Sequence, residues 1–216
     1  MKELICPALK RLPKGKKARA AEIAGALERV YPDAACALEY ESDPFRLLVM
    51  ARLSAQCTDK RVNQVSKDLF AALPDAAAFA AAPLETIEAL VKPCGLYHTK
   101  AQSIQAFSRI LVERYGGEVP RTKAELLALP GVGEKIANLM MGDVFGDPHI
   151  VADTHCIRLS GRWRLTESRE PSKVTRDLEK IVPKQEQSDF CHRVVDFGRD
   201  WCRAVNPDCE GCPLRG

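Results

Sequence analysis

The sequence has no long apolar run. None of its hydrophobic stretches approaches the roughly 20 residues that a transmembrane helix needs, and its start lacks the apolar block and small-residue cleavage site of a secretory signal. A membrane-spanning helix is therefore excluded by the pattern, and nothing in it suggests secretion. We expect no membrane partner and a cytoplasmic location.

Aromatic residues are also scarce. They make up 6% of the 216 residues, whereas alanine is abundant. Strands favour aromatic and β-branched side chains, and alanine is the best helix former. We therefore expect an all-α fold of one or two compact domains, since a chain of this length buries a real core.

A large excess of charge of one sign is absent, because 32 basic and 29 acidic residues give a formal net charge of only +3. It is unevenly spread, however: residues 1–20 contain seven basic residues against Glu3. This arm, residues 1–19, is suited to following a phosphate backbone. A solvated, frayed terminus explains it equally well. The basic residues are Lys2, Lys10, Arg11, Lys14, Lys16, Lys17 and Arg19.

Two short breaks between helices contain residues of interest. Ser42-Asp43-Pro44 begins one helix, with a capping oxygen before the proline, and Asp59 is expected to cap the next. The break between these helices, LSAQCTD, contains Gln56. A lone glutamine there is ordinarily a surface residue. A second break precedes a long helix that begins near Leu96, which by itself fits a simple helix staple.

A tight hairpin is predicted at residues 129–133, LPGVG. Thr122 and Glu125 form a capping box for the short helix before it, and Gly131 and Gly133 permit backbone angles that a side chain would forbid. A second helix follows, to about residue 145. Amides at the start of such a helix bind anions, so a DNA phosphate is the expected ligand.

A lysine and an aspartate follow the hairpin at a fixed distance. Lys135 lies in the first turn of the second helix, where the positive end of the helix dipole disfavours a charged ammonium and makes the amine a better nucleophile. It is equally readable as one more phosphate contact. Asp153, in the run VADTH, can cap a new helix while exposing a carboxylate, and it can also be a plain N-cap.

LPGVGEKIANLMM followed by VADTH, with the aspartate eighteen residues after the lysine, resembles the endonuclease III family of helix-hairpin-helix DNA glycosylases with abasic-site lyase activity. The resemblance implies that Lys135 is the nucleophile and Asp153 the essential carboxylate. It also implies a set of residues that bind the DNA. In this set LSAQ-x-TD supplies Gln56 and GLY-x-x-KA supplies Leu96 as wedges into the space of an extruded base, and the hairpin and VADTH supply Gly131, Val132, Gly133 and His155.

Nine cysteines are present, and three of them form a C-x6-C-x2-C pattern: Cys202, Cys209 and Cys212. By itself a CxxC pair is weak evidence for zinc or redox chemistry. The pattern is similar to the endonuclease III loop whose four thiolates hold a 4Fe-4S cluster. The other six, Cys6, Cys36, Cys57, Cys94, Cys156 and Cys191, fit ordinary reduced thiols.

The fourth cluster ligand is missing from the pattern. The family spacing continues C-x5-C, two positions beyond Gly216, so we expect this ligand outside the 216 residues and a chain of this length to hold iron poorly. Cys191 would bring the number of cysteines near this pattern to four. It lies eleven residues before Cys202 on a predicted helix, roughly 16 Å along the axis, so we expect it not to bind.

The resemblance implies a two-domain helix-hairpin-helix glycosylase fold. We expect a central domain at 37–148 with the hairpin motif at 122–145, and a second domain built from 20–36 and 149–216 with the iron-sulfur loop. The expected function is removal of oxidised pyrimidines from damaged duplex DNA, with lyase activity, by a bacterial, nucleoid-associated monomer. The alternatives are a monofunctional adenine glycosylase and a non-enzymatic helix-hairpin-helix module.

Overall fold

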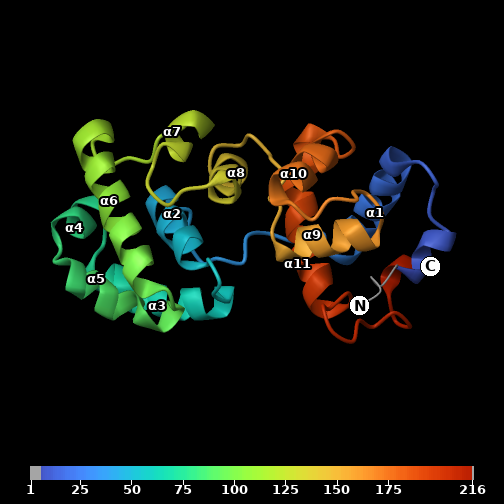
Figure 1. Ribbon diagram of the computed structural model, residues 1–216, viewed down its shortest axis with the longest axis horizontal. Helices are drawn as coiled ribbons and strands as arrows, with labels where there is room; N and C mark the ends of the chain where they lie inside the picture. Colours follow the sequence, from blue (N-terminus) through green and yellow to red (C-terminus); the bar gives the residue numbers. More distant parts are fainter. Residues whose placement is uncertain (1–5, 216) are drawn as a thin grey trace. The chain divides into compact units, whose positions relative to one another are not determined.

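The computed structural model describes residues 6–215, and all regular structure in that range is helical (Figure 1). The expectation of an all-α fold is confirmed. Residues 1–5, which include Lys2 of the basic arm, and Gly216 lie outside the described residues. No helix in the described range is both long and apolar enough to cross a membrane.

The α-helices and the short 3-10 helices (η) alternate with brief loops. The α-helices are α1 (Lys16–Val30), α2 (Pro44–Leu53), α3 (Asp59–Ala72), α4 (Ala76–Ala81), α5 (Leu84–Val91), α6 (Tyr97–Tyr115), α7 (Lys123–Leu127), α8 (Glu134–Asp143), α9 (Thr154–Arg162), α10 (Pro171–Glu179) and α11 (Gln187–Asp200). The 3-10 helices are η1 (Pro7–Lys10), η2 (Lys92–Cys94), η3 (Lys184–Glu186) and η4 (Pro213–Arg215).

The chain divides into two compact units. The central unit is Cys36–Gly146, and the terminal unit combines Met1–Ala35 with Asp147–Gly216. The sequence pattern placed the corresponding boundaries at 36/37 and 148/149. The terminal unit therefore draws its helices from both ends of the chain, whereas the central unit is one continuous segment.

The central unit is organised around α2, which packs against α3, α6 and α8 (Figure 1). Its start is set locally: Pro44 occupies the first turn, and the Asp43 carboxylate accepts the amides of Phe45 at 2.8 Å and Arg46 at 3.1 Å. Leu47, Leu48, Met50 and Leu53 are fully buried on it. An apolar helix surrounded by other helices gives this unit a single core.

The N-cap of α3 differs from the expected one by one residue. The Thr58 hydroxyl accepts the amide of Arg61 at 3.3 Å, so Thr58 is the cap. Asp59, the cap expected from the sequence, is instead the first helical residue. A carboxylate there complements the positive end of the helix dipole without being the cap.

In the terminal unit α11 packs against both α1 and α9 (Figure 1). The rings of Trp163 and Phe197 lie 5.7 Å apart between centroids in this core. Gly198 on α11 allows a close approach, because a Cβ there would lie 2.5 Å from Nδ1 of His155. The two 3-10 helices from opposite ends of the chain, η1 and η4, also contact each other.

Candidate functional site

The hairpin between α7 and α8 has the geometry that its glycines predict. Thr122 caps α7 by accepting the Glu125 amide at 3.3 Å, and the Val132 amide donates to the Leu129 carbonyl at 3.1 Å across the turn. Gly131 has a φ of 78°, in the left-handed region. A Cβ on it would lie 2.7 Å from Cβ of Ser103, so the turn needs glycine both for its angle and for its space.

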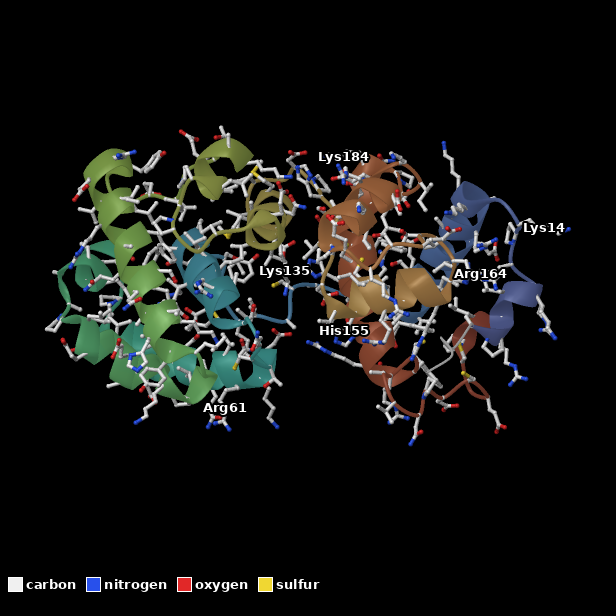
Figure 2. The ribbon with its side chains drawn as sticks, viewed as in Figure 1. Lys14, Arg61, Lys135, His155, Arg164 and Lys184 are labelled. Carbon is white, nitrogen blue, oxygen red and sulfur yellow. The ribbon has the colours of Figure 1, made fainter. Side chains whose placement is uncertain are left out.

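The start of α8 has open amides. Gly133 is its N-cap and no side chain caps the helix, so the first-turn amides have no partner inside it. Gly131, Gly133 and Lys135 are exposed, and the side chain of Lys135 is labelled in Figure 2. Val132 is buried and its amide is already used by the turn, so it shapes the hairpin rather than presenting a donor. The exposed face suits an anion at the positive end of the helix.

Gly131→Ala should lower the free energy of unfolding by about 1–3 kcal/mol, because a side chain at a left-handed angle is strained and here also meets Ser103 and the Arg52 guanidinium. Gly133→Ala is the matched control, since its φ of −103° is allowed and nothing lies within 4 Å of a Cβ there. Chemical denaturation of both variants measures the difference. Equal stability of the two would contradict the assignment of the tight turn to Gly131.

Asp153 lies in the terminal unit, at the start of α9. One carboxylate oxygen, Oδ1, accepts the Cys156 amide at 2.7 Å, so Asp153 is the N-cap. The buried residues Ile150, Val151 and Ala152 hold the segment before it, while Asp153 itself is half-buried. An N-cap bond of this kind occupies one oxygen and fixes the orientation of the carboxylate.

His155 lies in the first turn of α9, two residues after Asp153, and packs toward α11. Its Nδ1 lies 3.2 Å from the Arg158 guanidinium, and Arg158 also donates to the carbonyls of Gly198 and Cys202. Burial lowers the pKa of Arg158, and the positive charge of Arg162 adds to this lowering. His155 is thus half-buried within a network of the terminal unit.

Gln56 and Leu96 share an unusual backbone conformation. Their φ angles are 53° and 47°, both left-handed, and such angles are uncommon in residues other than glycine. Both side chains are exposed; Leu96 retains 54% of its accessible surface. Strained, exposed positions of this kind concentrate at binding sites. The family resemblance singled out these two residues, and their left-handed angles are a separate finding of the structure.

The two loops that carry Gln56 and Leu96 are connected by contacts among buried and half-buried side chains beside them. Burial raises the pKa of Cys94 to about 11, and the neighbouring Cys57, which hydrogen-bonds with it, contributes to the rise. Cys57 follows Gln56, and Cys94 lies two residues before Leu96. Lys100 is fully buried and donates to the Cys94 carbonyl at 2.8 Å. Gln56 and Leu96 therefore project from neighbouring, supported loops of the central unit.

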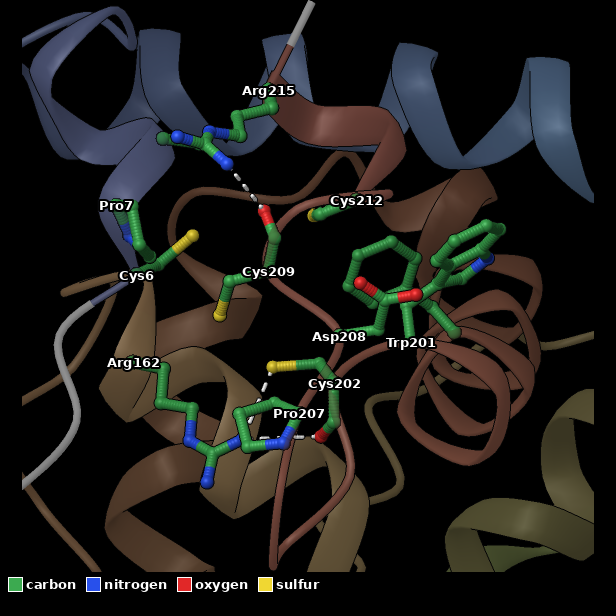
Figure 3. Close-up of a pocket in the computed structure, with 12 residues that line it drawn as sticks. Cys6, Pro7, Arg162, Trp201, Cys202, Pro207, Asp208, Cys209, Cys212 and Arg215 are labelled. Atoms are coloured by element: carbon green, nitrogen blue, oxygen red, sulfur yellow. Dashed lines mark hydrogen bonds between the residues drawn. The ribbon is translucent and has the colours of Figure 1, made fainter.

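A cavity in the terminal unit brings the three clustered cysteines together. Figure 3 shows the side chains of Cys202, Cys209 and Cys212 around it, with a fourth thiol, that of Cys6, on the same cavity. Its empty volume, including the part open to solvent, is about 370 Å³. The described residues contain no set of three or more His, Cys, Asp or Glu positioned to hold a single metal ion.

The electrostatics of the cavity reflect the gathered thiols. Burial raises the pKa of Cys6 to about 11, against the effect of the Ala8 backbone, and the neighbouring Cys212, Cys202 and Cys209 raise it further. Burial also raises the pKa of Cys212. Arg162 provides positive charge: its Nη1 donates to Sγ of Cys202 at 3.2 Å. The site thus concentrates sulfur ligands beside a buried guanidinium.

Cys6 is the site residue that sequence reasoning missed. It lies 196 residues before Cys202, so no local spacing connects the two. The Cys-Pro pair that it forms with Pro7 is repeated at Cys212-Pro213, and this is the one signal in the sequence that sets it apart from the other scattered thiols. Cys191, by contrast, is buried elsewhere, where its sulfur accepts the Val151 amide at 3.2 Å.

Comparison with known proteins agrees with this geometry. A family model described as HhH-GPD superfamily base excision DNA repair protein matches residues 49–184, which places the chain in that class. The endonuclease III of Synechocystis sp. is 43% identical over 200 residues, covering 92% of this chain and 91% of its own length. The chain belongs to the endonuclease III family, as the resemblance implied.

Two solved structures are similar along nearly the whole chain. A non-covalent endonuclease III–DNA complex matches with a TM-score of 0.88 at 41% identity, covering 92% of each chain. A trapped covalent endonuclease III–DNA intermediate, an estranged-adenine complex, matches with a TM-score of 0.87 at 41% identity, covering 92% of this chain and 93% of the other. The fold described above is therefore the fold of endonuclease III proteins whose structures have been solved in complex with DNA.

Proposed function

We propose that this protein is a base excision repair DNA glycosylase that removes oxidised pyrimidines from duplex DNA and then cleaves the abasic site as a lyase. The observation that carries the proposal is Lys135, exposed on the first turn of α8 beside the uncapped hairpin amides. Membership of the endonuclease III family supports it, as does the similarity to a trapped covalent DNA intermediate.

DNA binding begins at the hairpin. The amides at the start of α8 would hold a backbone phosphate irrespective of sequence, so the protein can scan a duplex. A damaged base unpairs more cheaply than an intact one and can be rotated out of the stack at a cost of a few kcal/mol. Gln56 and Leu96 would then fill the vacated space. His155, in the terminal unit, would also bind the DNA.

Lys135 would carry the covalent chemistry. Its neutral amine attacks C1′ of the extruded nucleotide, the glycosidic bond breaks, and its electron pair leaves with the base, which takes up a proton. The C1′–O4′ bond then opens to give a Schiff base between C1′ and Nζ, with O4′ protonated. Loss of a C2′ proton forms the C2′–C3′ double bond while the 3′ phosphate leaves, and water finally releases the lysine.

Asp153 would assist from the start of α9. A carboxylate can accept the proton that the lysine loses on attack, or it can stabilise the positive charge that develops on the sugar. Both roles require a charged group held in one orientation. The Cys156 amide supplies that orientation, because it holds Oδ1 at 2.7 Å.

The three clustered cysteines fit the proposed 4Fe-4S cofactor. Their side chains line one cavity, in which a fourth thiol, that of Cys6, also lies, and thiolate ligation is how proteins ordinarily hold such a cluster. When bound, the cluster would organise the loop 202–212, with no part in the bond-breaking steps.

The substrate assignment is tested by incubating the protein with labelled duplexes that contain one oxidised pyrimidine, an adenine opposite an oxidised guanine, or no damage. We expect nicking of the first without added alkali. Base loss from the adenine duplex that needs alkali to nick the strand would indicate a monofunctional enzyme. Equal binding of all three with no base release would indicate a non-enzymatic DNA-binding module.

We expect the enzyme to act as a monomer on nucleoid DNA in a bacterial cytoplasm.

Gln56→Ala and Leu96→Ala should each weaken binding to damaged duplex about tenfold or more. Truncation of Leu96 removes an apolar contact worth about 1.5–3 kcal/mol when fully buried, and truncation of Gln56 leaves the unpaired base without a hydrogen-bond partner. Binding to undamaged duplex should hardly change, since the wedges act only once a base is extruded. Val112→Ala is the control, as Val112 is another partly exposed apolar residue of the central unit. Equal losses on damaged and undamaged DNA would mark Gln56 and Leu96 as scaffold.

A further inference from the structure

We propose that Cys6 supplies the fourth thiolate of the cluster bound by Cys202, Cys209 and Cys212. This inference rests on the 4Fe-4S cluster of the proposed function and names a fourth ligand for it among the described residues. The four thiols lie around one cavity although Cys6 precedes the others by almost the whole chain (Figure 3). A 4Fe-4S cluster ordinarily takes four cysteine ligands, and four are present here.

The remaining five cysteines lie away from this cavity. Cys36, Cys57 and Cys94 belong to the central unit, whereas the cavity lies in the terminal unit. Cys156 and Cys191 are buried in the terminal unit, and Cys191 accepts the Val151 amide. None of these five lines the cavity. Cys6 is therefore the one thiol that joins the C-terminal set.

The backbone of Cys6 is fixed at the cavity. Its amide donates to the Arg162 carbonyl at 3.2 Å, and its own carbonyl accepts the Leu9 amide at 3.1 Å. Pro7 follows in the first turn of η1, which restricts the chain there. Cys6 exposes only 7% of its accessible surface, so packing against the terminal unit holds it in place.

Arg162 connects both sides of the proposed ligand set. Its carbonyl holds Cys6, while its guanidinium donates to Sγ of Cys202 and to the carbonyls of Cys202, Arg203 and Ala204. It is itself buried. Hydrogen bonds to cluster sulfurs and burial are two of the features that set the properties of such a cluster. One residue of α9 thus positions thiols from both ends of the chain.

A second contact between the chain ends lies beside the first. The Arg11 guanidinium donates to the Arg215 carbonyl at 2.5 Å, and the Arg215 side chain donates to the Cys209 carbonyl at 3.2 Å. These bonds join η1, η4 and the cysteine loop. They also place two guanidinium groups near a site where four thiolates would concentrate negative charge.

The 216-residue chain should be purified without oxygen, together with Cys6→Ser, Cys6→Ala, Cys209→Ser and Cys191→Ser. Iron and sulfide per chain, visible absorption and electron paramagnetic resonance are the readouts. With Cys6 as the fourth ligand, we expect about four irons in the parent chain and in Cys191→Ser, as four-thiolate ligation requires. This replaces the poor iron binding that the C-terminal spacing alone predicts. Both Cys6 variants should lose about one iron or the whole cluster, as Cys209→Ser should. Circular dichroism confirms that each variant is folded.

Three outcomes would count against the proposal in distinguishable ways. Cys6 variants that keep about four irons and the parent spectrum would overturn the role of Cys6 alone, provided that Cys209→Ser loses them. A colourless parent chain, unaffected by any of these substitutions, would overturn the cluster itself. One bound zinc per chain would replace the cluster with a single-ion site, and the role of Lys135 would be untouched in every case.

Discussion

Borohydride added to the protein with abasic-site duplex should trap a covalent protein–DNA complex, and Lys135→Ala should reduce that complex to background. The reason is chemical: a Schiff base between Nζ and C1′ is reduced to an amine that no longer hydrolyses. Lys135 is exposed on α8, so DNA can reach it without rearrangement of the hairpin. A denaturing gel that separates free from protein-linked DNA measures the yield.

Two further variants sharpen this experiment. Lys135→Gln should lose trapping but still bind DNA, because the amides at the start of α8 remain. Lys67→Ala removes an exposed lysine on α3 of the same unit and should trap normally. Strand cleavage by the parent protein with no trapped adduct would refute the lyase mechanism, and trapping by Lys135→Ala would move the nucleophile to another amine.

Asp153→Asn should slow base release by roughly 10²–10⁴-fold, the usual contribution of a positioned acid–base group, while leaving the protein about as stable as before. Asparagine caps helices as well as aspartate does, so the bond from the Cys156 amide is preserved and only the charge is lost. Single-turnover rates on an oxidised-pyrimidine duplex, set beside thermal unfolding, separate the two effects.

The comparison with Asp153→Ala completes the test. Alanine removes the cap as well as the charge, so it should also lower the stability by about 0.5–2 kcal/mol. If Asp153→Asn retained the parent rate, Asp153 would be an N-cap and nothing more. If both variants lost activity only in proportion to lost folding, the carboxylate would likewise have no chemical role.

Local chemistry made much of the central unit predictable. Asp43 with Pro44 specified the start of α2, and Thr122 with Glu125 specified the start of α7, because a cap acts on amides two or three residues away. The one-residue error at α3 has the same origin. Thr58 and Asp59 are adjacent and both can cap, and only the tertiary fold selects between them.

Features that depend on distant contacts were not predictable in this way. The left-handed angles of Gln56 and Leu96 are imposed by packing beneath their loops, where Lys100 and the Cys57–Cys94 contact lie. The place of Cys6 depends on the carbonyl of Arg162, a partner 156 residues away. The roles of Lys135 and Asp153 came from a motif and a spacing, and they stay predictions until the variants are measured.

The assembly of the terminal unit from both chain ends has a consequence for synthesis on the ribosome. The central unit, a continuous segment, can fold once about residue 146 has emerged. Helix α1 is made before the central unit, yet it packs against α11 and η4, which are made after that unit. Its apolar residues Ile23 and Leu27 are fully buried in the folded protein. They therefore remain exposed to solvent until α11 has been synthesised. Nascent chains stalled before α11 should therefore recruit chaperones through α1, and release should coincide with completion of the cysteine loop.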